Sequence, residues 1–480
     1  MSRENYLNYI AGEWVGADDT SQNINPSDVS DIIADYPRAS REQTIEAINA
    51  ASDAFFEWSR FGVQARSDLL DAIGSQLLAQ KDSIGMLLSR EEGKTLPEGV
   101  GEVARAAYIF KFFAGEVLRK AGDLVSSVRP SIDVEITREP MGVVGIIAPW
   151  NFPAAIPAWK IAPALAYGNC VVFKPADLVP GTAHAIAKII AESGIPRGAF
   201  NFVMGRGSVV GEELVSNPKV NAITFTGSVD TGQKVAQTAV SRMAKFQLEM
   251  GGKNPLVVLD DADLDTAIDC AVNGAYFSTG QRCTASSRLI VTDGIHDKFV
   301  EALIARLSEL TVGNALDKGT NIGPVVDKNQ LNQDLYYIDE AKKEGATLAY
   351  GGDLLRRETE GFYLQPALFT ETVNSMRINK EEVFGPVATV IRVKDYEEAL
   401  SIANDTPFGL SSGICTSTLK FATHFRRCAE AGMVMVNLPT AGVDYHVPFG
   451  GRKGSSYGAR EQGRYAEEFY TTVKTNYVSS

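Results

Sequence analysis

The feature that most constrains this 480-residue chain is an alternation of short β-branched runs with amphipathic helical segments. The first series, between residues 143 and 260, consists of VVGIIAPW, CVVFKP, FNFVMG, AITFTG and PLVVLD, and a second series includes SRLIVT and PVATVIRV. Short strands separated by crossover helices form parallel sheets. The pattern therefore predicts an α/β protein with two sheet units and a cleft between them.

Two earlier segments have other periods. From Arg41 to about Leu118, apolar residues recur at helical spacing, which predicts a helical N-terminal region. Within residues 129–140, Ile132, Val134 and Ile136 alternate with polar residues, as in a half-buried strand. We expect this strand either to form a hairpin or to pair with another molecule.

Composition and charge exclude several classes of protein. An apolar share of 45% and a charged share of 22% are ordinary for a folded soluble chain. The net charge of −13 provides no general attraction to nucleic acid or to an anionic membrane, so neither partner is expected. The first residues carry no export signal, and no apolar run approaches the roughly 20 residues that cross a bilayer. We therefore expect a cytoplasmic protein.

The five cysteines include one candidate nucleophile. They form an odd set without a C-x-x-C pair, which fits neither a disulfide framework nor a zinc site, so no metal is expected. Cys170 and Cys270 lie in apolar runs and are predicted to be structural. Cys283 instead follows a glycine, has polar neighbours and lies beside Arg282, a setting that favours a thiolate. A thiolate attacks carbonyls and leaves readily from thioesters.

Two other polar residues are candidates for the same chemistry. Glu249, in LEMGGKNP, stands between apolar residues and glycines, where a glutamate facing a cavity would act as a base and one at a turn would merely be solvated. Asn151, in PWNFP, follows a predicted strand, where its amide would stabilise an oxyanion or simply form a turn. The local pattern leaves both alternatives open.

Two glycine-containing segments are candidates for phosphate binding. Residues 205–211, GRGSVVG, have one residue too many for G-x-G-x-x-G and are predicted to be an ordinary strand-to-helix turn. In residues 223–232, ITFTGSVDTG, a strand runs into Gly227 and Ser228 before a predicted helix. The free amides at that helix start would hold a pyrophosphate, although a small residue there also serves packing.

Taken together, these segments resemble the NAD(P)-dependent aldehyde dehydrogenase superfamily over essentially the whole chain. The shared motifs are PWNFP, VVFKPAD, FTGSVDTG, LEMGGKNP, GQRCTASSR, EEVFGPV, NDTPFGL and PFGGRKGSSYGAREQG. The resemblance implies a Rossmann-like cofactor domain (1–124 and 144–250), a related α/β catalytic domain (251–435) and a small β oligomerisation element (125–143 and 460–480). It also implies a homodimer or a homotetramer.

The resemblance further assigns catalytic roles. Cys283 would attack an aldehyde, with the side chain of Asn151 and the backbone amide of Cys283 stabilising the oxyanion. Glu249 would activate the water that hydrolyses the resulting thioester, and Glu461 matches a glutamate proposed to relay protons. The cofactor-binding residues would be Pro149, Trp150, Lys174, Asp177, Gly227, Ser228, Glu382 and Phe384.

Two positions refine the expected chemistry. Asp177 stands where many NAD-preferring members have glutamate, so NAD is favoured, while the shorter carboxylate arm leaves NADP as an alternative. Members that transfer the acyl group to CoA lack a base at the position of Glu249. Its presence here favours hydrolysis to a carboxylic acid and makes a CoA-acylating or inactive homologue the weaker alternative.

Segment 437–457 resembles that of bacterial 2-oxoglutarate semialdehyde (2,5-dioxopentanoate) dehydrogenases. Phe277 stands where many succinic semialdehyde dehydrogenases have arginine, but succinic or glutaric semialdehyde and a broad aldehyde range remain alternatives. Arg282 would bind a distal carboxylate, lower the pKa of Cys283 or face solvent. His446 is more often structural than catalytic in such a loop. The expected pocket residues are Ile156, Trp159, Phe277, Arg282 and Thr284, with residues 440–445 closing the entrance.

Overall fold

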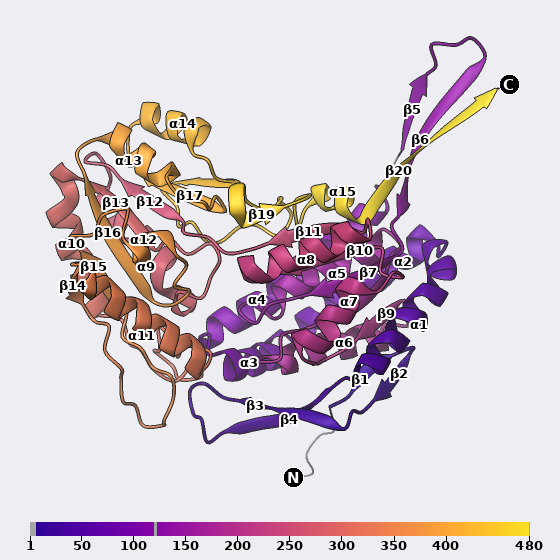
Figure 1. Cartoon of the computed structure of the whole chain (residues 1–480), viewed down its shortest axis with the longest axis horizontal. Coiled ribbons are helices and arrows are strands. Elements are labelled where there is room, and N and C mark those ends of the chain that lie inside the picture. The colour runs from indigo at the N-terminus through magenta and orange to yellow at the C-terminus, as the bar shows by residue number, and fades with distance from the viewer. Residues whose placement is uncertain (1–5, 120–121, 480) are drawn as a thin grey trace.

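The computed structural model of the chain describes residues 6–119 and 122–479. The predicted segments 1–124 and 460–480 therefore include residues 1–5, 120–121 and 480, which lie outside the described part. Figure 1 shows two lobes, each with a sheet covered by helices, and a narrow strand element that projects from one of them. The α/β architecture expected from the alternating pattern is confirmed.

Eight strands of the described chain form the first sheet, whose central strands are parallel. The outer strands β1 and β19 join it antiparallel. In spatial order the strands are β19 (Ser456–Tyr457), β11 (Lys245–Glu249), β10 (Ala222–Thr226), β7 (Val143–Ile147), β8 (Cys170–Lys174), β9 (Phe200–Phe202), β1 (Asn8–Ile10) and β2 (Glu13–Val15). Strands β8 and β10 are buried along their whole length, which is why they read as β-branched runs rather than as alternating patterns.

Helices cover both faces of this sheet. The crossover helices are α5 (Ala155–Ala166), α6 (Pro180–Glu192), α7 (Glu212–Ser216) and α8 (Val229–Ser241). The predicted helical N-terminal region consists of α1 (Arg41–Ser59), α2 (Val63–Ala79), α3 (Lys81–Glu92) and α4 (Leu96–Val117). A capping box at Ser40 and Gln43 starts α1. The GRGSVVG segment forms a short π-helical turn that leads from a strand into α7, as expected of a strand-to-helix turn.

The second sheet contains seven strands of the described residues. In spatial order they are β14 (Thr347–Tyr350), β15 (Ala367–Thr370), β16 (Val387–Val393), β13 (Arg288–Thr292), β12 (Pro255–Val258), β17 (Ser411–Cys415) and β18 (Met433–Val436). The helices packed around it are α9 (Leu264–Tyr276), α10 (Asp293–Ser308), α11 (Lys328–Lys343), α12 (Arg377–Lys380), α13 (Tyr396–Asn404) and α14 (Leu419–Cys428). Strand β18 lies at the edge of this sheet.

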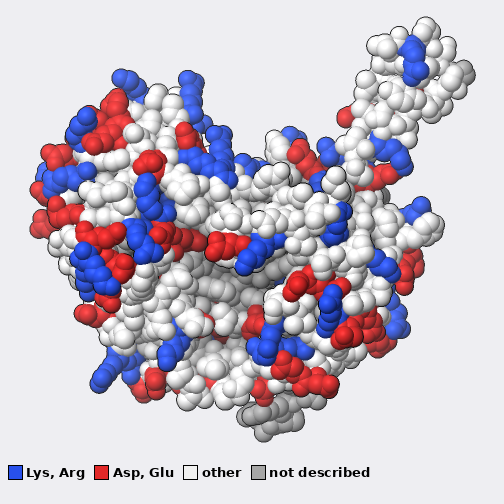
Figure 2. Space-filling model, viewed as in Figure 1, with Lys and Arg blue, Asp and Glu red and all other residues white. Residues whose placement is uncertain are grey.

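The projecting element is a small antiparallel sheet of β5 (Asp123–Ser126), β6 (Ile132–Pro140) and β20 (Thr471–Ser479). Strand β20 follows the short helix α15 (Glu467–Tyr470). The strand expected in residues 129–140 thus forms a hairpin with β5, and its other edge pairs over nine positions with the C-terminal strand. Most of this element is free of charged side chains on the face that Figure 2 displays.

A separate two-stranded ribbon, β3 (Asp19–Ile24) and β4 (Ile32–Arg38), lies below the first lobe in Figure 1. Among the helices of residues 6–119 and 122–479, none is long and apolar enough to cross a membrane.

Candidate active site

The candidate nucleophile follows a sharp turn at the end of α9. Ser278 and Thr279 have left-handed backbone conformations with φ of 51° and 57°, and Gly280 follows with φ of 66°. A side chain at Gly280 would place its Cβ 2.1 Å from the carbonyl oxygen of Gly385, so only glycine fits. Strained turns of this kind are typical of functional sites. The turn ends the helix and directs the chain to Cys283.

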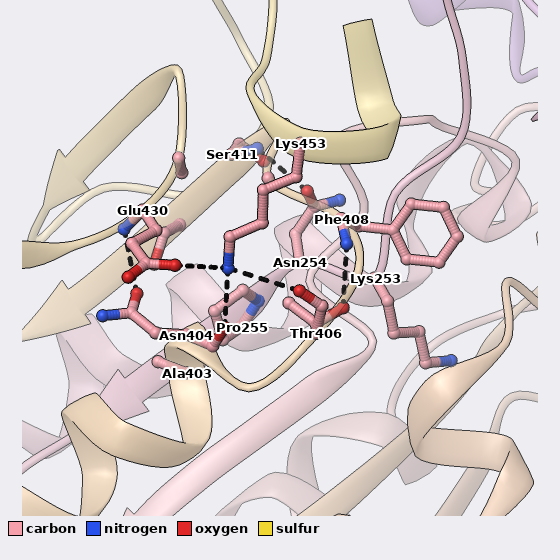
Figure 3. Close-up of a pocket in the computed structure, with 13 residues that line it drawn as sticks. Lys253, Asn254, Pro255, Ala403, Asn404, Thr406, Phe408, Ser411, Glu430 and Lys453 are labelled. Atoms are coloured by element: carbon pink, nitrogen blue, oxygen red, sulfur yellow. Dashed lines mark hydrogen bonds and ion pairs between the residues drawn. The ribbon is translucent and has the colours of Figure 1, made fainter.

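Asn254 holds the nucleophile loop from behind. Its Nδ2 donates to the carbonyl oxygens of Cys283 and Ala285 at 2.8 and 3.0 Å, and its Oδ1 accepts from the backbone N–H of Ser411 at 2.9 Å. Figure 3 shows the bond between Asn254 and Ser411 of β17. A single asparagine therefore fixes Cys283 relative to β12 and β17. This role was not predicted from the sequence, because the partners of Asn254 lie far along the chain.

The small cavity drawn in Figure 3 is a structural junction. Its free volume is about 10 Å³, no more than one water molecule needs. The Nζ of Lys453 donates to the carbonyl oxygen of Asn404 at 2.7 Å and lies 2.6 Å from Oε2 of Glu430. Lys253 points away from this cluster. Lys453 thus links the C-terminal segment to the end of α13.

The thiol of Cys283 starts from its neutral form. Burial, with smaller contributions from the charges of Glu382 and Glu249, raises its pKa to about 12 against weaker backbone hydrogen bonds. The charge of Arg282 interacts favourably with that of Cys283, but it does not offset the effect of burial. Arg282 is itself compensated, because its Nη2 lies 3.3 Å from Oε1 of Glu98 and donates to Ser278 Oγ at 2.9 Å.

Asn151 lies on the loop between β7 and α5. Its side chain is buried, and Nδ2 donates to the carbonyl oxygen of Gln281 at 2.9 Å, two residues before the nucleophile. Its backbone oxygen accepts from Nζ of Lys94 at 2.7 Å. Lys94 is paired at 2.7 Å with Glu102, which also accepts the backbone N–H groups at the start of α5. This buried ion pair holds the loop beside Cys283.

Glu249 ends strand β11 and is 2% exposed. Its Oε2 accepts from Ser456 Oγ at 2.5 Å, whereas its Oε1 is buried and has no hydrogen-bond partner among the described residues. Burial raises the pKa of Glu249 well above its ordinary value, and the charge of Glu461 adds to this effect. The carboxyl group therefore keeps its proton to a higher pH than an ordinary glutamate does.

Glu461 lies deeper than Glu249. It forms an ion pair with Lys160, and Thr224 Oγ1 donates to its Oε1 at 3.2 Å. Burial raises its pKa, which Lys160 opposes. Two cavities meet at Cys283, and neither Glu461 nor Glu249 lines them. The charges of the two glutamates nevertheless interact with one another.

Cys283 lies on both of these cavities. The first has a volume of about 230 Å³ and brings together many of the predicted residues. Its lining includes Pro149, Trp150, Asn151, Gly227, Ser228, Cys283, Glu382 and Phe384. Glu382 accepts from the backbone N–H of Gly252 at 2.9 Å, and a Cβ at Gly251 would lie 2.1 Å from its Oε2. Trp150 and Phe384 meet edge to face, with ring centroids 5.3 Å apart.

A third cavity of about 630 Å³ lies further along the carboxyl edge of the first sheet. Lys174, at the end of β8, lines it together with residues of α8 and the segment 207–215. Its Nζ donates to the carbonyl oxygen of Pro175 at 2.8 Å and lies 3.9 Å from Asp177 Oδ1. Burial lowers the pKa of Lys174, which Asp177 opposes. Ser228 precedes α8 between this cavity and the first.

The second cavity at Cys283 has a volume of about 300 Å³. Of the predicted pocket residues, Ile156, Trp159, Arg282 and Thr284 line it, as do Ala441, Gly442 and Val443 of the predicted entrance segment. The structure does not place Phe277 there; its ring packs against the apolar core beneath the second sheet, because the turn after α9 carries the chain away. The exposed His446 does not line the cavity but contacts Tyr445, with ring centroids 5.3 Å apart.

Sequence reasoning missed Arg105 and Asn273 in this cavity. Arg105 lies on α4 and Asn273 on α9, and neither belongs to a motif that points to a binding site. Arg105 stands in an ordinary amphipathic helix, where an arginine most often faces solvent. Only the packing of α4 against α5 brings its guanidinium to the wall of the cavity.

Comparison with known proteins is consistent with this geometry. The model of the "Aldehyde dehydrogenase family" matches residues 14–476. The chain is 46% identical to an alpha-ketoglutaric semialdehyde dehydrogenase of Bacillus subtilis and 42% identical to an alpha-ketoglutarate semialdehyde dehydrogenase of Haloferax volcanii, covering 98% of both chains in each case. A crystal structure of betaine aldehyde dehydrogenase from Staphylococcus aureus with NAD+ is 35% identical and has a TM-score of 0.97, with coverage of 99% of this chain and 95% of that one.

Proposed function

The chain belongs to the aldehyde dehydrogenase family, and on that premise we propose that it oxidises 2-oxoglutarate semialdehyde to 2-oxoglutarate with NAD through a covalent intermediate on Cys283. The observation that carries this proposal is that Cys283 lies where two cavities meet. The residues proposed to bind the cofactor line the first cavity, and aromatic residues and two arginines line the second.

Cys283 is the nucleophile of the proposed reaction. Its thiol gives a proton to the ionised form of Glu249 as sulfur attacks the aldehyde carbon, and the aldehyde oxygen becomes an oxyanion. The amide of Asn151 and the backbone N–H of Cys283 stabilise that charge, a contribution that is usually a large part of catalysis in acyl transfer. Nδ2 of Asn151 has two hydrogens, so it can keep its bond to the carbonyl oxygen of Gln281 and donate the other hydrogen to the oxyanion.

The residues around the first and third cavities fit NAD. The backbone of Gly251 leaves room for Glu382 to face the cavity, where its carboxylate would bind ribose hydroxyls. Lys174 would bind the ribose at the adenine end, and Ser228 with the start of α8 would hold the pyrophosphate. Pro149, Trp150, Gly227 and Phe384 complete the walls of the first cavity. Bound NAD would supply the hydride acceptor of the reaction. Loss of the hydride converts the thiohemiacetal on Cys283 into a thioester.

Glu249 is the proposed base for hydrolysis of the thioester. A carboxylate with a raised pKa is better matched to proton transfer near neutral pH than an ordinary one. Its unpartnered Oε1 is available to accept a proton from water, and Glu461 with Lys160 would pass that proton inward. The thiol of Cys283 is the leaving group and is regenerated.

The cofactor preference rests on Asp177. Its carboxylate lies 3.9 Å from Lys174 and 3.9 Å from Arg38, so its negative charge faces the proposed ribose site but is partly balanced. A carboxylate there binds a 2′-hydroxyl and repels a 2′-phosphate. We propose NAD as the preferred cofactor and NADP as a poorer alternative.

The assembly is proposed to be a homodimer or a homotetramer in the cytoplasm. The projecting sheet exposes apolar side chains, including Leu124, Val125 and Tyr477, which a second copy would cover. The five free cysteines fit a reducing compartment.

The nucleophile is tested by Cys283→Ala. We expect NADH formation, followed by absorbance at about 340 nm, to fall at least about a thousandfold, since removal of a covalent nucleophile removes the main route of reaction. Cys428→Ala is the matched control, because Cys428 is half-buried on α14, away from both cavities. Equal activity of the two variants would refute the assignment.

The substrate is tested by initial rates with 2-oxoglutarate, succinic and glutaric semialdehydes, betaine aldehyde and pentanal. The proposal requires the highest kcat/KM for 2-oxoglutarate semialdehyde. A preference for betaine aldehyde or pentanal would leave the chemistry at Cys283 intact and remove the substrate assignment. A rate that depends on added CoA would replace hydrolysis by acyl transfer.

A further inference from the structure

The second cavity contains an unusual combination of groups. Its walls are largely apolar, formed by Phe152, Ile156, Trp159, Val443 and Phe449. Arg105 and Arg282 also line it. A guanidinium next to apolar walls is unfavourable unless it has an anionic partner. The two arginines differ in whether the protein already provides an anionic partner.

Arg282 already has an anionic partner within the protein, Glu98, although its buried Nε has no hydrogen-bond partner in the described part of the chain. Its Nη1 donates to the backbone oxygen and to Oδ1 of Asn273, both at 3.3 Å. Its Nη2 contacts Glu98 at 3.3 Å and Ser278 Oγ at 2.9 Å. Glu98 also accepts the N–H and O–H of Ser278 at 2.8 and 2.9 Å. Arg282 thus belongs to the network that holds the left-handed turn before Cys283.

Arg105 has few partners. Its Nη2 donates to Oε1 of Gln462 at 3.1 Å, a neutral acceptor. Its Nε is buried and has no hydrogen-bond partner in the described part of the chain. The guanidinium carbon lies 5.9 Å from the centre of the Trp159 ring, which fixes its plane beside the cavity. Its charge also interacts with that of Cys283, so the two groups face a common space.

The carboxylates near Arg105 leave it without an ion pair among residues 6–119 and 122–479. Glu102, one turn earlier on α4, is paired with Lys94. Asp444, on the exposed segment at the cavity entrance, influences the charge of Arg105 but forms no ion pair with it. Arg105 is therefore a cation at the cavity wall that interacts with the charges of Glu102 and Asp444 without forming an ion pair with either.

We propose that Arg105, rather than Arg282, binds the distal carboxylate of the substrate and sets the preference of this enzyme for anionic aldehydes. The inference rests on the proposed oxidation of a semialdehyde and names the residue that selects it. A guanidinium presents two parallel N–H donors that match a carboxylate. The charge of Asp444 interacts with the same guanidinium and therefore opposes the binding of an anionic substrate there.

The test compares two aldehydes in each variant. The readout is the ratio of kcat/KM for 2-oxoglutarate semialdehyde to that for pentanal, which has a similar chain length and no charge. For Arg105→Met we expect this ratio to fall about 10- to 100-fold, the effect of losing a hydrogen-bonded charge partner, mainly through KM. Arg105→Lys keeps the charge and restores part of the ratio.

Arg282→Gln is the matched control at the other arginine. It should lower kcat for both aldehydes alike, because Arg282 acts by holding the nucleophile turn. A merely structural role of Arg105 would likewise lower both rates and leave the ratio unchanged, and that result would overturn the inference. A fall in the kcat/KM ratio for Arg282→Gln, without a fall for Arg105→Met, would also overturn the inference.

A second variant covers the case in which Arg105→Met does not fold. Asp444→Asn removes the competing charge from an exposed segment and should raise the ratio about twofold or more. An unchanged or lower ratio would contradict the role of Arg105. If the wild-type protein itself gives a ratio near one, the proposed substrate class fails; a large wild-type ratio that survives in both Arg105 variants overturns only this inference.

Discussion

At the scale of single residues, burial decides the state from which the chemistry begins. Cys283, Glu249 and Glu382 all carry less charge at rest than they would in water, because desolvation disfavours each anion. The pKa of Glu382 is raised to about 7. The resting site therefore carries less negative charge than the same three groups would carry in water.

The pKa of Cys283 predicts how its reactivity depends on pH. A thiol with a pKa of about 12 is neutral below that value, so its thiolate fraction rises tenfold per pH unit through the neutral and alkaline range. We expect the rate of alkylation by iodoacetamide, without cofactor, to rise continuously from pH 7 to about 10. Mass spectrometry of the peptide containing Cys283 provides the measurement. A plateau of the rate below pH 8 would mean that the thiolate is already formed at rest.

At the scale of elements, residues at and after the junction of α3 and α4 form hydrogen bonds to the loops of the site. Lys94 bonds the loop of Asn151, Glu102 caps α5, and Glu98 holds the turn before Cys283. Elements of the N-terminal helical region thus position both the oxyanion donor and the nucleophile. The two loops are held by one cluster of charges, so we expect them to respond together when the cluster is disturbed.

Loss of Lys94 is predicted to destabilise this cluster. Lys94→Met leaves Glu102 as a buried carboxylate without its cation, which costs about 3–5 kcal/mol. We expect a clear decrease in the thermal unfolding midpoint and a lower kcat, since the Asn151 loop loses its anchor. The double variant Lys94→Met/Glu102→Gln removes both charges of the 2.7 Å pair, and only Glu92, 4.0 Å from Lys94, then loses its cation. The loss of stability in the double variant should be smaller than the sum of the two single losses, and strict additivity would refute the coupling.

At the scale of the whole molecule, the projecting three-stranded sheet is the part that folding leaves uncovered. Val125, Val134 and Tyr477 lie in one row across its strands, and Val125 and Tyr477 are 47% and 61% exposed. Figure 2 shows this sheet standing away from the charged surface of the lobes. We expect a second copy of the chain to cover this row of exposed apolar side chains.

The oligomer is tested by Val125→Asp/Tyr477→Asp. Light scattering on wild-type protein should give a multiple of the chain mass of 51.8 kDa, and the double variant should shift toward the monomer because it places charge in the interface. Leu354→Asp is the control, since Leu354 is 57% exposed and lies outside the projecting sheet. A wild-type monomer, or a variant that keeps the wild-type mass, would contradict the assignment.

Much of this protein is determined by sequence patterns that act over short distances. The β-branched runs and helical periods predicted the α/β class, because side chains repeat at the spacing of the element that they occupy. The alternation within residues 129–140 predicted a strand and left open whether it forms a hairpin or pairs with another molecule, and the turn at GRGSVVG followed from local conformational preferences. The motifs around Cys283, Glu249 and Asn151 likewise predicted residues that the structure brings to one region, and the family resemblance drawn from them is confirmed by the match over residues 14–476.

Only the tertiary structure decided the electrostatic state and the lining of the site. The neutral thiol of Cys283, the engagement of Arg282 by Glu98 and the absence of Phe277 from the cavity lining depend on burial and on partners far away in sequence; Ser278 and Glu98 are 180 residues apart. The same holds for Arg105, which α4 brings to the cavity wall. Charge interactions and desolvation act through space, so a linear pattern predicts them only where the interacting groups are also neighbours in the chain.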